Sequence, residues 1–190
     1  LHKTTLTERI YLSRGRIYSI NLQETTLISA CDFTEVSVID KANFQETKFS
    51  MAAKFTHTHL YEANFDNAHF KGAAIFASSE LGGLLQETSF RFIHFYNEVD
   101  FSGVKFYSRT AFTGSIFEQH VNDEMASFVG SVDFSEVEFK GGVNFEGTMF
   151  DAIYKNNGDI SFPEDLTLTA EGLPKGAKWV RFNKYGEPVQ

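Results

Sequence analysis

Large apolar residues recur along the chain every five or six residues, and this spacing organises most of the sequence. A helix is excluded, because a five-residue step rotates by about 140° on a helix of 3.6 residues per turn and would scatter these residues around the axis. A fixed repeat predicts a solenoid, in which each coil buries its apolar face against its neighbours. The positions are Leu22, Leu27, Phe33, Val38, Phe44, Phe49, Phe55 and Leu60 upstream, then Phe90, Phe95, Phe101, Phe106, Phe112, Phe117, Phe128, Phe134, Phe139, Phe145 and Phe150.

A small or β-branched residue stands two positions before most of these large residues, as Ala42 does before Phe44 and Val132 before Phe134. Alternate residues of an extended segment point to the same face. Both members of each pair therefore face inward, while the residue between them, such as Asn43 or Asp133, faces water. The sequence thus predicts short strands with turns between them, too closely spaced for the longer strands of a sandwich.

The segment from Ala63 to Phe70, which reads Ala-Asn-Phe-Asp-Asn-Ala-His-Phe, shows the unit most clearly. It resembles the pentapeptide-repeat family, whose pattern is Ala-(Asp/Asn)-(Leu/Phe)-X-X, and the resemblance extends over about residues 22–162. The six-residue steps resemble the Phe-rich variant of that family, in which steps of five and six alternate. The resemblance implies an all-β fold, a right-handed quadrilateral parallel β-helix with irregular N- and C-terminal caps.

We expect a single domain over residues 1–190, with an N-terminal cap at 1–16, repeat coils at 17–162 and a C-terminal cap or tail at 163–190. An open solenoid end exposes apolar core and unpaired strand edges. Trp179, the only tryptophan, is therefore expected to fold over the last coil. The alternative is an aromatic surface for a dimer or another domain, which would allow a homodimer through an uncapped end. Because the chain begins with Leu1 rather than Met, we also expect that an upstream segment is missing.

The repeat is interrupted at two places. The segment from Ala77 to Leu84 contains paired glycines, which predict a loop leaving the coil. Asp123 stands where a large apolar residue is due, and a charge is costly to bury there. We therefore expect residues 120–124 to bulge outward, with Val121 or Met125 refilling the gap. Each break is interpreted either as a tolerated departure from the repeat pattern or as a recognition loop.

Charge is distributed unevenly along the chain, whose net charge is −8. Residues 17–174 carry 23 acidic and 9 basic side chains, whereas the two flanks carry 2 acidic and 8 basic ones. No Lys or Arg lies between Arg109 and Lys140. A surface of one sign steers oppositely charged partners and repels nucleic acid, although it also serves solubility alone. The candidate partner-binding residues are Glu118, Asp123, Glu124, Asp133, Glu136, Glu138 and Trp179.

Motifs for catalysis or cofactor binding are absent from the sequence: it has no GxGxxG, P-loop, GxSxG or HExxH pattern. The histidines His57, His59 and His69 are interpreted as surface or turn residues rather than metal ligands, and Cys31 as an inert core thiol. We therefore expect no enzyme activity, no cofactor and no metal. No apolar run approaches the ~20 residues of a membrane span, and the composition is typical of a cytoplasmic protein.

Three functions remain open at this point. The first is a non-enzymatic protein-interaction or scaffold module built on a rigid acidic solenoid, with an unidentified protein partner and no direct nucleic-acid binding. The second follows from the resemblance, because some pentapeptide-repeat proteins mimic DNA with an acidic rod and bind a type II topoisomerase, DNA gyrase. The third is a targeting or recognition domain of a larger bacterial protein, such as an effector.

Overall fold

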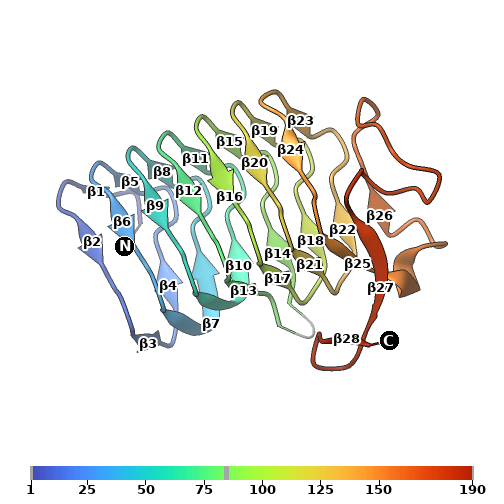
Figure 1. Cartoon of the computed structure of the whole chain (residues 1–190). Coiled ribbons are helices and arrows are strands. Elements are labelled where there is room, and N and C mark those ends of the chain that lie inside the picture. Colours follow the sequence, from blue (N-terminus) through green and yellow to red (C-terminus); the bar gives the residue numbers. More distant parts are fainter. Residues whose placement is uncertain (1, 84–85, 190) are drawn as a thin grey trace.

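The chain winds into a four-sided rod whose coils stack from the N-terminal to the C-terminal end (Figure 1). The computed structural model describes residues 2–83 and 86–189. Successive coils are joined by parallel pairing of short strands, usually of two residues, and the register places like positions of neighbouring coils side by side. We name the four sides of the rod face A, B, C and D, in the order in which the chain meets them.

Faces A and B are two separate parallel sheets of seven strands each. Face A consists of β1 (Thr5–Leu6), β5 (Thr26–Leu27), β8 (Lys48–Phe49), β11 (His69–Phe70), β15 (His94–Phe95), β19 (Ile116–Phe117) and β23 (Glu138–Phe139). Face B consists of β2 (Ile10–Tyr11), β6 (Cys31–Asp32), β9 (Ala53–Lys54), β12 (Ala74–Ile75), β16 (Val99–Asp100), β20 (Val121–Asn122) and β24 (Val143–Asn144).

Faces C and D join into one sheet, because two longer strands, β7 (Ser37–Asn43) and β10 (His59–Asn64), run through the corner between them. Face C otherwise contains β3 (Arg16–Ile17), β13 (Glu80–Leu81), β17 (Lys105–Phe106), β21 (Ser127–Phe128), β25 (Met149–Asp151) and β27 (Lys178–Phe182). Face D otherwise contains β4 (Ile20–Asn21), β14 (Thr88–Ser89), β18 (Thr110–Ala111), β22 (Val132–Asp133) and β26 (Ile160–Ser161).

Many corners of the coils are built by an Asp or Asn that stands between the small and the large inward residue. Its side-chain oxygen accepts a hydrogen bond from the backbone N–H two residues later, at 2.9 Å from Asp66 N to Asn64 Oδ1 and 2.9 Å from Ser102 N to Asp100 Oδ1. Such turns pull the chain around sharply. The residue that follows the donor then has a positive φ, as Asn67 and Gly103 do. The polar position of the repeat therefore makes the corner.

The interior is filled by four columns of side chains, one behind each face. Rings within a column stack nearly parallel, with centroids 4.8 Å apart for Phe55 and Phe76. Rings of the opposite columns behind faces B and D meet edge to face, as Phe55 and Phe65 do at 5.5 Å and 89°. Both arrangements are favoured by the quadrupole of the aromatic ring. The spacing of phenylalanine in the sequence is thus the spacing of the core.

The phenylalanines predicted to stack inside do so, with one difference at an end. Phe95, Phe106, Phe117 and Phe150 are buried, whereas Phe139 is only partly buried because β23 is the last strand of face A. Cys31 is buried in the small-residue slot of face B, and burial raises the pKa of its thiol to about 11. A thiol in this state stays protonated and is a poor nucleophile.

Of the predicted N-terminal cap, residues 1–16, the described part from residue 2 onward is built as a coil. Thr5 lies opposite Thr26, Ile10 opposite Cys31 and Arg16 opposite Ser37, in the register of the later coils. The sequence did not reveal this coil because leucine and isoleucine occupy its inward slots in place of phenylalanine. Its inward side chains are only partly buried, since no coil among the described residues lies beyond it.

The C-terminal end is closed by the tail. After β26 the chain returns to face C as β27, which pairs in parallel with β25 and places Trp179 opposite Phe150. In Figure 1 β27 is the long red strand that crosses this end of the rod. A short strand, β28 (Pro188–Val189), pairs with β27 in antiparallel fashion. A single 3-10 turn, η1 (Ala152–Tyr154), follows β25.

These features confirm the predicted fold class, a right-handed quadrilateral parallel β-helix. No helix within residues 2–83 and 86–189 is long and apolar enough to cross a membrane.

Candidate functional site

The acidic residues predicted from the sequence are spread over several sides of the rod. On face A, Glu118 Oε1 accepts a hydrogen bond from Lys140 Nζ at 3.1 Å and lies 2.8 Å from His94 Nε2. The hydrogen bonds with His94 and Lys140 lower the pKa of Glu118. Glu138 lies on the same face, with its Oε2 atom 3.7 Å from Lys140 Nζ. Lys140 therefore partly neutralises this part of the acidic stretch.

Asp133 lies on face D and is held by hydroxyl groups. Its Oδ1 atom accepts from Ser135 Oγ and Ser161 Oγ, both at 2.6 Å, and Oδ2 accepts from Thr113 Oγ1 at 2.9 Å. Burial opposes ionisation of this carboxyl, but the hydrogen bonds from these residues outweigh it and lower its pKa to about 2. Glu136 stands at the corner that leads to face A, with a positive φ. A recognition role for these residues and for Glu124 stays a prediction.

Asp123 does not bulge outward, and that expectation was wrong. Its side chain is 2% exposed and occupies the inward slot behind face B, between the coils that carry Phe101 and Phe145. Val121 keeps its own small-residue slot and Met125 is exposed, so neither refills a gap. The backbone explains this placement, because the N–H of Asp123 donates to the carbonyl of Asn144 at 2.9 Å and holds the coil in register. A buried Asp123 does not contact a partner.

The loop predicted from Ala77 to Leu84 begins later than expected. Ala77 to Leu81 continue the regular coil, with Ser79 buried at the corner and β13 in register with β10. The extra residues lie between β13 and β14, where Gly83 forms a bridge with Gln86. Leu84 lies outside the described residues. The interruption of the repeat therefore lies between the strands of faces C and D.

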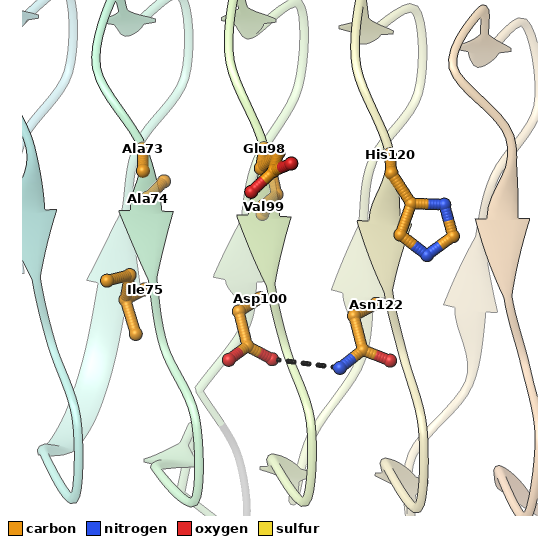
Figure 2. A pocket seen from close by; sticks show the side chains of 8 residues that line it. All are labelled: Ala73, Ala74, Ile75, Glu98, Val99, Asp100, His120 and Asn122. Atoms are coloured by element: carbon orange, nitrogen blue, oxygen red, sulfur yellow. Dashed lines mark hydrogen bonds between the residues drawn. The ribbon is translucent and has the colours of Figure 1, made fainter.

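A hollow of about 320 Å³ lies on face B (Figure 2). It forms because Ala73 and Ala74 carry short side chains, while Glu98 and His120 project from the next coils at the adjoining corner. Asp100 accepts a hydrogen bond from Asn122 Nδ2 at 3.4 Å across its lower part. No cluster of three or more His, Cys, Asp or Glu side chains suited to a metal ion occurs in the described part of the chain.

Face C carries a row of apolar and aromatic side chains that the sequence analysis missed. Tyr18, Ile39 and Tyr61 each follow the inward residue of β3, β7 and β10, so they lie on successive coils. Their exposed fractions are 69%, 38% and 44%. The only signal in the sequence is that an apolar residue follows the inward residue of this face in each of the first three coils. These three residues are hereafter called the exposed row.

The same row continues on later coils, where the chain covers it with its own tail. Tyr107 and Val129 occupy the equivalent positions after β17 and β21. Gly186, in the turn between β27 and β28, lies so close that an added Cβ would be 2.4 Å from Tyr107 Cε1 and 3.4 Å from Val129 Cγ2. This turn, residues 183–187, is called the C-terminal turn. Face C is therefore already a docking surface within the molecule.

Trp179 has the contacts expected of a cap. Its ring is partly buried and lies 6.4 Å from the ring of Phe150 in an edge-on arrangement. Its Nε1–H donates to the carbonyl of Glu171 at 2.9 Å, and Lys155 Nζ lies 5.8 Å from the ring centroid. A role for Trp179 in binding a partner stays a prediction.

The histidines singled out in the sequence lie on different sides of the rod. His57 is exposed at a corner with positive φ, His59 lies on face C and His69 on face A. His59 Nδ1 is 3.0 Å from Glu80 Oε2, and the ring of His69 lies 6.5 Å from that of His94. The structure therefore does not bring the three together.

The comparison with protein families decides the nature of the repeat. A model described as pentapeptide repeats, in nine copies, matches residues 33–80. This segment belongs to the pentapeptide-repeat family. The resemblance inferred from the sequence is thus confirmed. The pentapeptide repeats of this segment run from face B of one coil to β13, and the same four-sided coil continues on both sides of them.

Two solved structures are similar to the chain, both trypsin-treated variants of QnrB1, a plasmid-mediated fluoroquinolone resistance protein. One has 13% identity and a TM-score of 0.32, with 96% of this chain and 93% of that chain covered. The other has 13% identity and a TM-score of 0.29, with 97% and 90% covered. At these values the two structures carry no weight for the function of this chain. A comparison with curated protein sequences gives no significant match.

Proposed function

We propose that this chain is a non-enzymatic protein-interaction module and that it binds its protein partner with face C. The observation that carries the proposal is the exposed row of Tyr18, Ile39 and Tyr61 on three successive coils. Coils in such a stack lie about 4.8 Å apart, so the row extends over roughly 10 Å. Exposed aromatic side chains in a fixed array are typical anchors of protein interfaces.

The tail supports this choice of face over the other three. The C-terminal turn packs on Tyr107 and Val129, which continue the exposed row toward the C-terminal end. The residues that precede Tyr18, Ile39 and Tyr61 are paired in register from coil to coil, and the register shifts only after Leu60. A partner segment on the exposed row would extend a contact that the fold already makes.

The interior supports a binding role rather than catalysis. The phenylalanine columns fill the rod, so any chemistry is confined to the outer faces. Parallel pairing on all four sides also holds the outward side chains at fixed positions. A rigid surface of this kind loses little conformational entropy on binding, which favours affinity.

The test replaces the exposed row and follows partner binding. Tyr18→Ser, Ile39→Ser and Tyr61→Ser together should abolish enrichment of the partner from an extract of the source organism, and the purified partner should then bind at least tenfold more weakly. The matched control is Ile28→Ser with Met51→Ser, which removes two exposed apolar side chains, 46% and 55% exposed, at the other side of the rod. Equal binding by the triple variant and the control would contradict the proposal, provided that both keep the wild-type melting temperature.

The two alternatives raised by the sequence stay predictions. A DNA-mimicking rod needs one extended acidic surface, whereas here Glu118 is paired with Lys140, Glu35 with Arg14 and Asp133 with hydroxyl groups. A supercoiling assay with DNA gyrase tests that alternative directly. The full-length gene sequence tests the alternative of a recognition domain in a larger protein.

A further inference from the structure

A cleft of about 250 Å³ lies on face C between the exposed row and the C-terminal turn. Its walls are aromatic, with Tyr61 on one side, Tyr107 on the other and Tyr185 contributed by the turn. Gly82 and Gly83 form its floor. Clefts lined by aromatic rings with a few fixed polar groups are the usual form of a small-ligand site.

The cleft exists because glycine interrupts the row of face C at one coil. Gly82 occupies the position equivalent to Tyr61 and Tyr107, with a φ of +89°, and any side chain there would collide with Ser108. The two tyrosines are therefore two coils apart, roughly 10 Å at the usual strand spacing. Both rings lean toward the coil between them, since an added Cβ on Gly83 would be 2.6 Å from Tyr61 Cε1 and Tyr107 Oη is 3.3 Å from Glu80 Oε1. A cation is attracted to an aromatic face within ~6 Å of the ring centroid.

A carboxylate is fixed beside this gap. Glu80 Oε1 accepts a hydrogen bond from Tyr107 Oη at 3.3 Å, and Glu80 Oε2 lies 3.0 Å from His59 Nδ1. Burial, together with the charge of Glu80, raises the pKa of Tyr107 to about 12, so its hydroxyl group stays a donor. Glu187 adds a second negative charge near the ring of Tyr107. A group bound in the cleft would therefore be close both to aromatic rings and to negative charge.

A cation already lies on one wall of the cleft. Lys184 Nζ is 4.9 Å from the ring centroid of Tyr185, and Lys184 lines the cleft. Within the described residues Lys184 forms no ion pair, and its ammonium group contacts the ring of Tyr185. Its long side chain is exposed and free to turn aside. Lys184 therefore places an ammonium group at the edge of the cleft, where it would compete with a bound cation.

We propose that this cleft is a binding site for an alkylammonium group, held between Tyr61 and Tyr107 and paired with Glu80. The group would come from a lysine side chain or from a quaternary ammonium compound, since both present a positive charge at the end of an alkyl chain. Recognition of such cations by aromatic cages is well established in physical terms. The site goes beyond the proposed function, because it requires no protein partner and is tested without one.

The experiment titrates the full chain separately with tetramethylammonium chloride and with N-acetyl-lysine methylamide, and follows the backbone amide signals of Gly82, Gly83 and Gly186 by two-dimensional NMR. At least one cation should give saturable shifts, and the one that binds more tightly identifies the source of the group. The neutral compound tert-butanol should give none. Non-saturable shifts with both cations, or equal shifts with tert-butanol, would overturn the proposal.

Two variants make the test specific. Glu80→Gln should weaken binding about tenfold, whereas Lys184→Met should strengthen it several-fold by removing the competing ammonium. Glu35→Gln is the matched control, since that carboxylate pairs with Arg14 at a distant corner, and it should leave the affinity unchanged. Unchanged or weaker binding by Lys184→Met would show that Lys184 belongs to a self-contained contact and would refute the site. Neither variant alters Tyr18 or Ile39, so this result is independent of the test of the proposed function.

Discussion

The buried carboxyl of Asp123 should make the stability of the rod depend on pH. Its side chain is 2% exposed and lies in the column of face B, between the coils that carry Phe101 and Phe145. Burial, with a smaller contribution from the charge of Asp100, raises its pKa from 3.8 to about 7. The folded chain therefore keeps a proton that the unfolded chain has already released between those two values.

The sign and the size of the effect follow from this difference. Each pKa unit corresponds to 1.36 kcal/mol, so a shift of about three units amounts to roughly 4 kcal/mol. Because the folded-state pKa is raised, the stabilisation is fully present below pH ~4 and is lost as the pH rises toward ~7. Above pH ~7 the loss is complete and the free energy of unfolding no longer falls on account of Asp123.

Asp123→Asn isolates this effect, since asparagine keeps the shape but cannot ionise. Guanidinium unfolding of wild type and variant at pH 4, 5, 6, 7 and 8 gives the difference in free energy of unfolding at each pH. The variant should equal the wild type near pH 4 and exceed it by roughly 4 kcal/mol at pH 8, with a slope of about 1.4 kcal/mol per pH unit between them. Glu138→Gln, an exposed carboxylate, is the control and should give a flat difference. A flat difference for Asp123→Asn as well would contradict a buried carboxyl with a raised pKa.

Three further predictions concern the core, the tail and the acidic stretch. Phe112→Ala should lower the free energy of unfolding by about 3–5 kcal/mol, as buried phenylalanine truncations do. Glu138→Ala should change it by no more than about 0.5 kcal/mol. Equal denaturation midpoints for the two variants would mean that the inward and outward faces of the coil are assigned the wrong way round. Deleting residues 172–190 should expose the edge of face C and cause aggregation in light scattering, and a monomeric product with an unchanged melting temperature would show that the tail is no cap. The pKa of the Asp133 carboxyl is lowered to about 2, so this group contributes stability above pH ~4 that is lost as the pH falls through ~2. Ser161→Ala should raise the pKa of Asp133 measured by NMR. An unchanged pKa would contradict the hydrogen bond from Ser161 to Asp133.

The repeat made most of the fold predictable because one physical pattern is used many times. A Phe every five or six residues specifies both the inward face and the stacking partner, as Phe55 and Phe76 illustrate. The same logic failed at Asp123, where residue type argued against burial. There the turn residue Asn122 and the ladder to Asn144 fix the backbone, so the carboxyl is carried inside regardless of its own preference.

The candidate sites were less predictable, because they depend on what lies outside the repeat. Tyr18 and Tyr61 read as ordinary outward residues, and their alignment becomes visible only when the coil length is known. The cleft requires in addition that Lys184 and Tyr185 return to face C, a placement that comes from the pairing of β27 with β25. Nothing in the local sequence of the C-terminal turn indicates which face it covers.

The coil-to-coil ladder also determines how the rod would respond to a pulling force along its axis. Each coil is held by its neighbours, and among the described residues the first coil, from β1 to β4, pairs on one side alone. Under tension it should detach first, while β27 clamps the other end. A coil of about 22 residues advances the folded rod by only ~4.8 Å but releases up to roughly 75 Å of extended chain. Under tension the rod should therefore lengthen in discrete steps, one coil at a time, beginning with the first coil.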